Sequence, residues 1–414
     1  MYDDPREPSE LTTPPMNLLH VIPYFAPAWA YGGVVRATTE LTRALTDAGH
    51  RVVVVTTDTL SPSERIDTEE EIIDGVRVVR LRNWSNLLRG KLNLSSPRMF
   101  TATIRDLMAE HQIEVVHSHE MRTTENLRLA ALTKELGVPL VLSPHGTLPY
   151  ETGRQTVKQL WDRAFGTRLL PHFAQVIALT GAEADEARAV WSACGVPLPD
   201  ERISIVPNGI HLDDFAALPP ADPFRAQWGL GEGPVVLFLG RLQERKGVQF
   251  LIPAFAQAVE TAPDAKLLIV GPDEGMLATA QAQVEEYGLG DRVVFTGLLT
   301  GQDRLAALAA ADVFAMPAVG EGFSMAVLEA MACGLPALLT PGCNFPEAAA
   351  EGAGIVAPRE VPALADALTT LLTDSDQRAS MGRCAQALIR ERYTWAQVAA
   401  QMDAVYRRVA ARKR

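Results

Sequence analysis

Two carboxylates stand in the otherwise apolar stretch GEGFSMAVLEAMACGLP at 320–336, where Glu321 and Glu329 are eight positions apart. The second half of this stretch predicts a helix, since methionine, alanine and leucine favour helix interiors. Ser324 is the predicted N-cap, and Gly334 near a proline is a typical stop signal. Glu321 then lies in the entry loop and Glu329 about 7 Å along the axis from Ser324. Carboxylates so far apart do not share one proton and suit two groups of one extended ligand.

Two cations follow an apolar run at GRLQERKG, 240–247, which places Arg241 and Lys246 at the carboxyl end of a predicted strand. Ligands of parallel sheets bind at that edge. An arginine fork and a lysine point charge can hold a diphosphate without a metal, and a helix N-terminus adds backbone donors. Together with the two glutamates these cations predict a phosphate site, and the alternative is two solvated loop cations.

The composition is that of an ordinary globular protein. A chain of 414 residues exceeds what one core usually serves, which predicts two domains, and a net charge of −12 argues against a nucleic-acid partner. Four scattered cysteines without a C-x-x-C pair fit a reducing cytoplasm and indicate no zinc site. No apolar run approaches the roughly 20 residues of a membrane span. The polar, proline-rich start at 1–15 predicts a disordered leader, not a signal peptide.

Short β-branched runs alternate with longer amphipathic stretches, a pattern typical of βαβ units and parallel sheets. The predicted strands cover 16–22, 51–57, 76–81, 113–119, 139–143, 175–180 and 203–209, and then 234–241, 266–271, 292–297, 312–317 and 336–340. We therefore expect an α/β fold of two Rossmann-like, doubly wound domains, 16–210 and 211–392, which face each other across a cleft. An amphipathic helix at 393–414 is expected to pack back on the first domain.

The order and spacing of the motifs resemble the retaining GT-B glycosyltransferases of family 4, also described as group 1 glycosyl transferases. The likeness rests on GRLQERKG, FTG at 295–297, EGFSMAVLEAMACGLP and PE at 346–347. It extends to GGVVRATTELTRALTDAGHRVVVVTT, VVHSH, SPHGTL, VPNGI and the closing YTW helix, and so covers nearly the whole chain. The resemblance implies transfer of a hexose from a UDP- or GDP-linked donor to an acceptor hydroxyl, with retained anomeric configuration.

By matching motif, the resemblance also implies roles for individual residues. Glu321 would lie by the hydroxyls of the donor sugar, and Glu329 would bind the ribose hydroxyls. Arg241 and Lys246 would hold the diphosphate, and His145 would lie near the reacting carbon. The implied donor-binding set is Gly32, Gly33, Arg241, Lys246, Gly297, Leu298, Glu321, Gly322, Phe323, Ser324, Met325 and Glu329, and catalytic roles fall to Glu321, His145, Arg241 and Lys246.

Histidines and acids elsewhere indicate less. The alternative for His145 is a packed histidine that orients a loop, and His117 and His119 are expected to be structural. The only D-x-D string, Asp374 to Asp376, begins a polar helical segment and is predicted to be an N-cap. Neither a metal nor another cofactor is therefore implied.

A basic stretch, 75–105, suggests where the acceptor comes from. It holds seven cations and no acid, with apolar side chains between them. Such a surface suits an anionic membrane, which predicts a cytoplasmic enzyme that docks on the inner membrane face and extends a lipid-linked glycan; the alternative is a solvated loop. The cations are Arg77, Arg80, Arg82, Arg89, Lys91, Arg98 and Arg105, and the apolar residues are Trp84, Leu87, Leu88, Leu92, Leu94 and Phe100.

Three other functions compete with this interpretation. A glycoside hydrolase also uses two carboxylates, about 5 to 9.5 Å apart, but has no need of Arg241 and Lys246. A dehydrogenase would carry G-x-G-x-x-G after the first strand, where this chain has YGGVV. A subunit or sensor that binds nucleotide sugars without catalysis is the third, and retention of both glutamates and both cations argues against it.

Overall fold

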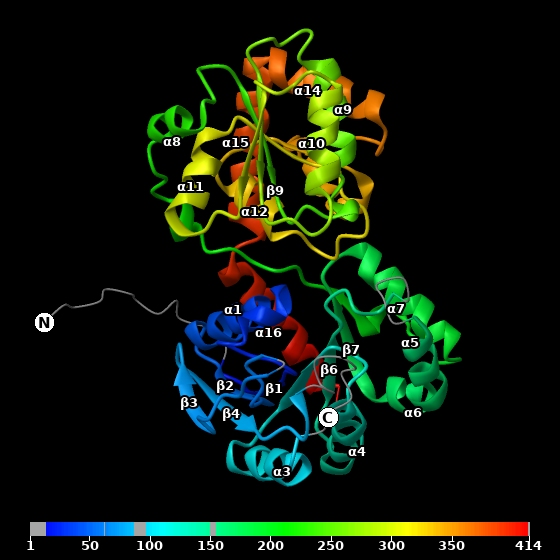
Figure 1. Cartoon of the computed structure of the whole chain (residues 1–414). Helices are drawn as coiled ribbons and strands as arrows, with labels where there is room; N and C mark the ends of the chain where they lie inside the picture. Colours follow the sequence, from blue (N-terminus) through cyan, green and yellow to red (C-terminus); the bar gives the residue numbers. More distant parts are fainter. Residues whose placement is uncertain (1–13, 62, 87–96, 150–154, 413–414) are drawn as a thin grey trace, which may run out of the picture. The chain divides into compact units, whose positions relative to one another are not determined.

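The computed structural model describes residues 14–61, 63–86, 97–149 and 155–412. The chain divides into two compact units (Figure 1). The N-terminal unit ends at Gly209 and takes in the last helix from Trp395 onward, and the C-terminal unit is Ile210–Thr394. Both divisions lie within about two residues of the boundaries predicted from the sequence. The leader proposed at 1–15 lies almost wholly outside the described residues.

The N-terminal unit is built on an eight-stranded sheet in the order β3-β4-β2-β1-β5-β6-β7-β8. All neighbours are parallel except β3 and β4, which pair antiparallel at one edge. The strands are β1 Asn17–Val21, β2 Arg51–Thr57, β3 Glu70–Ile73, β4 Val76–Leu81, β5 Val115–His119, β6 Leu140–Ser143, β7 Phe173–Ala178 and β8 Ile203–Ile205.

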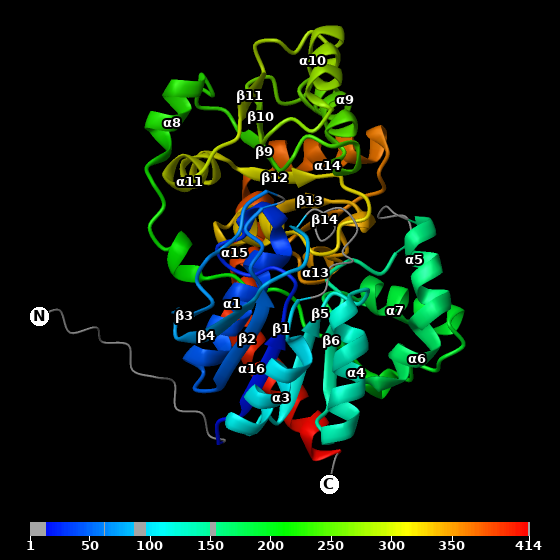
Figure 2. The same cartoon turned by 60° about the horizontal axis from the view of Figure 1, so that its bottom comes forward.

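Alternate residues of these strands face two separate cores, because successive side chains of a strand point to opposite faces. On β2, Val53 and Val55 belong to one core, and Val52 and Val54 to the other. The last helix, α16, packs into this second core, next to α1 and β5. The principal helices of the unit are α1 Gly33–Asp47, α3 Phe100–Glu110, α4 Thr124–Leu136, α5 Gln155–Trp161, α6 Thr167–Leu169, α7 Gly181–Ala193 and α16 Trp395–Ala411 (Figure 2).

The C-terminal unit has a six-stranded parallel sheet in the order β11-β10-β9-β12-β13-β14. Helices α8 and α11 lie on one side of this sheet, and α9 and α10 lie on the other (Figure 1). The strands are β9 Val235–Leu239, β10 Lys266–Val270, β11 Val293–Gly297, β12 Val313–Met316, β13 Ala337–Leu339 and β14 Gly354–Val356. The helices are α8 Ala221–Trp228, α9 Val248–Ala258, α10 Leu277–Glu286, α11 Gly301–Ala310, α12 Met325–Ala332, α13 Glu347–Ala350, α14 Val361–Thr373 and α15 Ser375–Arg392.

Every predicted strand has a counterpart, but two strands were missed and one was drawn too long. β3 has the sequence EEII and β14 has only three residues, so neither contains an apolar run long enough to predict a strand. The strand predicted at 203–209 ends at Ile205, since Pro207 has no N–H to donate to a ladder. No helix in the described ranges is long and apolar enough to cross a membrane.

Candidate functional site

Helix α12 begins directly after Ser324, which is its N-cap residue, as predicted. The Ser324 hydroxyl donates to Met316 Sδ at 3.6 Å and caps no amide of its own helix. The first amides of an α-helix have no partner inside the helix, so the N-terminus of α12 offers uncapped donors and a partial positive charge. The helix ends before Gly334, whose φ of +82° is the left-handed conformation expected of a glycine stop.

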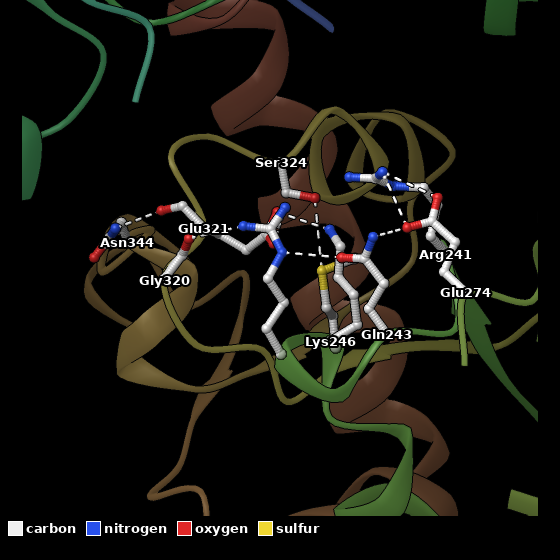
Figure 3. Close-up of polar contacts among 10 residues, drawn as sticks. Arg241, Gln243, Lys246, Glu274, Gly320, Glu321, Ser324 and Asn344 are labelled. Atoms are coloured by element: carbon white, nitrogen blue, oxygen red, sulfur yellow. Dashed lines mark hydrogen bonds and ion pairs between the residues drawn. The ribbon is translucent and has the colours of Figure 1, made fainter. Parts of the chain in front are cut away.

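Lys246 and Glu321 meet beside this helix N-terminus (Figure 3). Lys246 Nζ donates to Glu321 Oε2 at 2.7 Å, and the two residues are only 8% and 6% exposed. Gly247 makes this approach possible, because a Cβ there would lie 2.0 Å from the carbonyl oxygen of Pro317. The turn after β9 therefore packs against the end of β12 and brings a cation to a buried carboxylate.

The second carboxylate oxygen of Glu321, Oε1, is buried and accepts no hydrogen bond from the described residues. The Arg245 guanidinium lies 4.0 Å from this oxygen. The Glu321 backbone is fixed at both ends, since its N–H donates to the Gly342 carbonyl and its carbonyl accepts from Asn344 Nδ2. A buried acceptor in a fixed loop is suited to a hydroxyl donor from a ligand.

Arg241 does not lie with Lys246 and Glu321 in this structure. Its guanidinium donates to both oxygens of Glu274, at 3.0 and 3.2 Å, and Gln243 contacts the same carboxylate (Figure 3). The Arg241 side chain is half exposed, and exposed ion pairs contribute little to stability. Arg241 can therefore exchange Glu274 for a phosphate at small cost.

Glu329 is buried on α12 and forms an ion pair with Arg304 of α11. The sequence did not point to Arg304, because it lies in an alanine- and leucine-rich helix with no motif around it. This contact brings a guanidinium next to the carboxylate that was expected to bind ribose. The pair is held about one turn inside α12, away from the Lys246–Glu321 contact on the entry loop.

The remaining predicted donor-site residues of the C-terminal unit lie around these two pairs in sequence. Gly322 belongs to the loop before α12, and Phe323 stacks on Tyr393 with ring centroids 6.0 Å apart. Met325 is the first residue of α12. Gly297 ends β11 with a φ of +72°, and Leu298, which follows it, is 65% exposed.

Gly32 and Gly33 lie at the N-terminus of α1 in the N-terminal unit. Gly32 has a φ of +88° and a ψ of −151°, a conformation open essentially only to glycine, and Gly33 is the first helical residue. A Cβ at either position would meet no atom within 4 Å. The end of a 15-residue helix is thus left open, as close approach of an anion requires.

His145 follows β6 in a left-handed backbone conformation, with a φ of +55°. Such a φ is strained for a residue with a Cβ and is often found at functional sites. The loop is held by the buried carboxylate of Glu183, which accepts from the N–H groups of Gly146 and Leu179. Burial raises the pKa of Glu183, and its two backbone donors partly offset that effect.

The basic stretch at 75–105 carries less free charge than its sequence suggests. Arg77 pairs with Glu70 and Glu110, Arg80 is buried against Glu71, and Arg105 pairs with Glu135. The acids come from β3, α3 and α4, so counting charges along one segment missed them. Of the other predicted docking residues, Arg89, Lys91, Leu87, Leu88, Leu92 and Leu94 lie outside the described residues.

The D-x-D string is an N-cap, as predicted: Asp374 accepts from the N–H of Gln377 at 2.8 Å at the start of α15. Within the described ranges, one group of three residues is close enough to bind a metal ion, namely His20, His117 and His119. Two of these, His117 and His119, were expected to be structural.

Two family models and several characterised proteins match this chain. The model of the family described as "Glycosyl transferases group 1" matches residues 221–387, and that of "Glycosyltransferase Family 4" matches residues 31–214. The phosphatidyl-myo-inositol mannosyltransferase of Mycolicibacterium smegmatis is 30% identical over 91% of this chain and 90% of its own. A GDP-mannose-dependent alpha-(1-6)-phosphatidylinositol monomannoside mannosyltransferase of the same organism is 30% identical over 76% of this chain and 82% of its own.

Among solved structures, Anabaena HepE in complex with UDP-glucose superposes with a TM-score of 0.67 at 22% identity, covering 94% of this chain and 99% of that one. An identity this low shows the shared fold alone. The two-unit α/β architecture with parallel sheets is thus shared with HepE.

Proposed function

The chain belongs to the GT-B glycosyltransferases of group 1 and family 4, and from this premise we propose that it moves a hexose from a nucleotide diphosphate sugar to a hydroxyl of a lipid-linked acceptor, with retention. The observation that carries the proposal is the buried Lys246–Glu321 contact beside the uncapped N-terminus of α12. A cation and free amides in one place can take up the charge of a leaving diphosphate.

In the proposed reaction the bond between the anomeric carbon and the diphosphate oxygen breaks, and the acceptor oxygen bonds to the same face of that carbon. The acceptor proton passes to the leaving diphosphate, so no side chain need act as nucleophile or metal ligand. Lys246 and the amides of α12 stabilise the departing charge, and Oε1 of Glu321 accepts from a hydroxyl of the sugar. Their contribution is electrostatic and is greatest in the transition state.

For the donor we propose GDP-mannose, and for the acceptor an inositol-containing phospholipid or a similar lipid-linked sugar. The names of both mannosyltransferases include mannose and phosphatidylinositol, and one of them specifies GDP-mannose as the donor. UDP-glucose, present in the HepE complex, is the alternative donor. Membrane docking through 75–105 stays a prediction and now rests on Arg82, Arg98 and the exposed Trp84 and Met99, which are 69% and 73% exposed.

Slow donor hydrolysis tests the proposed reaction before any acceptor is known. Purified protein is incubated with GDP-mannose, UDP-glucose and other nucleotide sugars, and the released diphosphate is measured, with and without EDTA. We expect release from GDP-mannose that persists in EDTA, because Lys246 and the amides of α12 meet the diphosphate charge.

Two outcomes would contradict parts of this proposal. Tight nucleotide-sugar binding without any release, even when lipid acceptors are supplied, would favour the alternative of a non-catalytic sensor or subunit. A strict requirement for Mg²⁺ or Mn²⁺ would show that a metal takes the role given to Lys246.

Glu329→Gln is expected to weaken binding of the donor with little change in kcat. A ribose hydrogen bond to a carboxylate exists before and after chemistry, and hydrogen bonds to charged groups contribute about 1.5–3 kcal/mol, which corresponds to roughly 10- to 100-fold in KM. Isothermal titration with free GDP and UDP measures the loss without turnover. Arg304→Met removes the partner and keeps the carboxylate, so it separates ribose binding from the ion pair. Equal diphosphate affinity in wild type and Glu329→Gln would rule out the ribose role.

A further inference from the structure

A chain of six buried or partly buried side chains runs from the end of β6 to His145 through the core of the N-terminal unit. We call it the histidine chain. His20 comes from β1, His117 and His119 come from β5, and Tyr406 comes from α16. Its members in order are Ser143, His117, Tyr406, His20, His119 and His145.

The distances along the histidine chain are those of hydrogen bonds. His117 Nε2 lies 2.9 Å from Ser143 Oγ, and His117 Nδ1 lies 2.7 Å from Tyr406 Oη. Tyr406 Oη is 3.5 Å from His20 Nε2, and His20 Nδ1 is 3.0 Å from His119 Nε2. The last link joins His119 Nδ1 to His145 Nε2 at 2.8 Å. Both ring nitrogens of the three inner histidines are therefore occupied.

Neutral imidazoles satisfy every link of the histidine chain. A neutral imidazole donates one hydrogen bond and accepts one, so each of the three inner rings can serve both of its neighbours. Burial lowers the pKa of His20 to about 3 and that of His145 to about 4, and it lowers the pKa values of His117 and His119 well below 6.5. Tyr406, the remaining titratable member, has its pKa raised by burial and stays a neutral phenol.

If the Tyr406 hydroxyl donates to one neighbouring histidine and accepts from the other, every donor of the histidine chain points the same way. The shorter of the two Tyr406 contacts, 2.7 Å to His117, is the one that we assign to the hydroxyl as donor, and the 3.5 Å contact to His20 is much weaker. Tyr406 then donates to His117 Nδ1, which leaves the His117 proton on Nε2, facing Ser143. His20 Nε2 then donates to Tyr406 Oη, His119 Nε2 donates to His20 Nδ1, and His145 Nε2 donates to His119 Nδ1. Each of these three rings therefore carries its proton on Nε2.

We propose that Tyr406, His20, His117 and His119 are positioning residues that hold His145 neutral with its Nδ1 unprotonated, so that Nδ1 accepts a hydrogen bond from a hydroxyl of the donor sugar or the acceptor. His145 is partly exposed at the carboxyl end of β6, and its strained backbone is fixed by Glu183. The identification of the ligand group as a sugar hydroxyl rests on the proposed function. The assignment of the His145 tautomer is independent of that function.

Nitrogen NMR of the full-length protein, labelled with ¹⁵N-histidine, tests the tautomers without any assay of activity. Each of the eight histidines gives two ring-nitrogen signals, and single substitutions assign them. We expect His20, His117, His119 and His145 to be protonated at Nε2 alone and to stay neutral from pH 7 to pH 5, where an ordinary histidine takes up a proton. A proton on Nδ1 of His145, or a mixture of tautomers, would overturn the proposal.

Tyr406→Phe tests positioning, since it removes the hydroxyl and keeps the packed ring. We expect a single His145 tautomer to be lost, kcat to fall by about tenfold, the size of one lost hydrogen bond, and KM for the donor to change little. Met402→Leu, a volume-conserving change at a buried position of the same helix, is the control and should leave all three quantities unchanged. Unchanged His145 signals in Tyr406→Phe would exclude a positioning role for the phenol.

Metal analysis distinguishes this proposal from the alternative that the three clustered histidines bind a metal ion. The ligand atoms of His20, His117 and His119 lie within 4.8 Å of one another. A bound metal ion would need nitrogens that the histidine chain already uses. One equivalent of zinc in the purified protein, lost together with the tautomer pattern on chelation, would replace the histidine chain by a metal site. Absence of catalysis with any donor would contradict the proposed function and leave the NMR result standing.

Discussion

Replacement of Lys246 by methionine is expected to lower kcat for sugar transfer by about 10²- to 10³-fold, the cost of losing one preorganised donor to a developing charge. Lys246 is the buried cation of the candidate site, and its contact with Glu321 fixes it before any ligand binds. Steady-state kinetics with GDP-mannose, or with whichever donor is hydrolysed, measure the effect. The loss should fall mainly on kcat, since the leaving diphosphate gains charge only as its bond breaks.

Folding must be separated from catalysis in this experiment. Removal of one partner of a buried ion pair leaves the other unpaired, which typically costs about 3–5 kcal/mol of stability. The double variant Lys246→Met/Glu321→Gln removes both charges and should regain much of that stability while remaining inactive. Lys266→Met removes a cation at the amino end of β10, at the opposite edge of the sheet, and should behave like wild type. Near-normal turnover by a folded Lys246→Met variant would remove Lys246 from the mechanism.

Between pH 6 and pH 5 the free energy of unfolding of the N-terminal unit is expected to fall by about 5 kcal/mol. His20, His117, His119 and His145 have folded pKa values below 6.5, with His20 at about 3 and His145 at about 4. Below pH 6.5 the unfolded chain therefore binds more protons than the folded one. Stability is complete above pH 6.5 and is lost as the pH falls toward 4, at about 1.4 kcal/mol per histidine and pH unit.

Tryptophan fluorescence can follow this unit by itself. Trp228 is the only tryptophan between residues 210 and 394, so Trp228→Phe leaves reporters in the N-terminal unit alone. Urea unfolding of this variant at pH 7, 6 and 5 gives the change of the free energy of unfolding with pH. His20→Gln should reduce the slope of that dependence by the equivalent of about one proton. His50, whose pKa is also lowered by burial, acts in the same direction. If the free energy of unfolding does not change between pH 7 and pH 5, the four histidines have ordinary pKa values in the folded protein and are hydrated. Hydrated side chains would contradict the buried contacts of the histidine chain.

Much of the candidate site could be predicted because its parts are short and local. Arg241 and Lys246 follow an apolar strand, and Glu321 and Glu329 flank a helix start, so sequence order alone places them at the carboxyl edge of one sheet. The contact between Lys246 and Glu321 could not be predicted, since it depends on how closely the turn at Gly247 approaches the end of β12.

Long-range partners are the other part that the sequence could not supply. Tyr406 and His117 are 289 positions apart in the sequence, and Arg304 and Glu329 are 25 apart. No local sequence pattern identifies either pair. The free positive charge of 75–105 was overestimated for the same reason, because the acids that neutralise Arg77 and Arg105 come from other elements. The two sheets followed from strand spacing, but their edge strands β3 and β14 are too short to be recognised.

The placement of α16 also affects how the chain folds as it is made. Domains generally fold in order of synthesis, the N-terminal one first. Here the unit that begins first is finished last, because Trp395, Val398, Met402, Val405 and Tyr406 complete a core whose other members are translated before residue 210. The C-terminal unit is continuous and can fold while α16 is still inside the ribosome. Until α16 has left the ribosome, the apolar face that it covers stays open to chaperones.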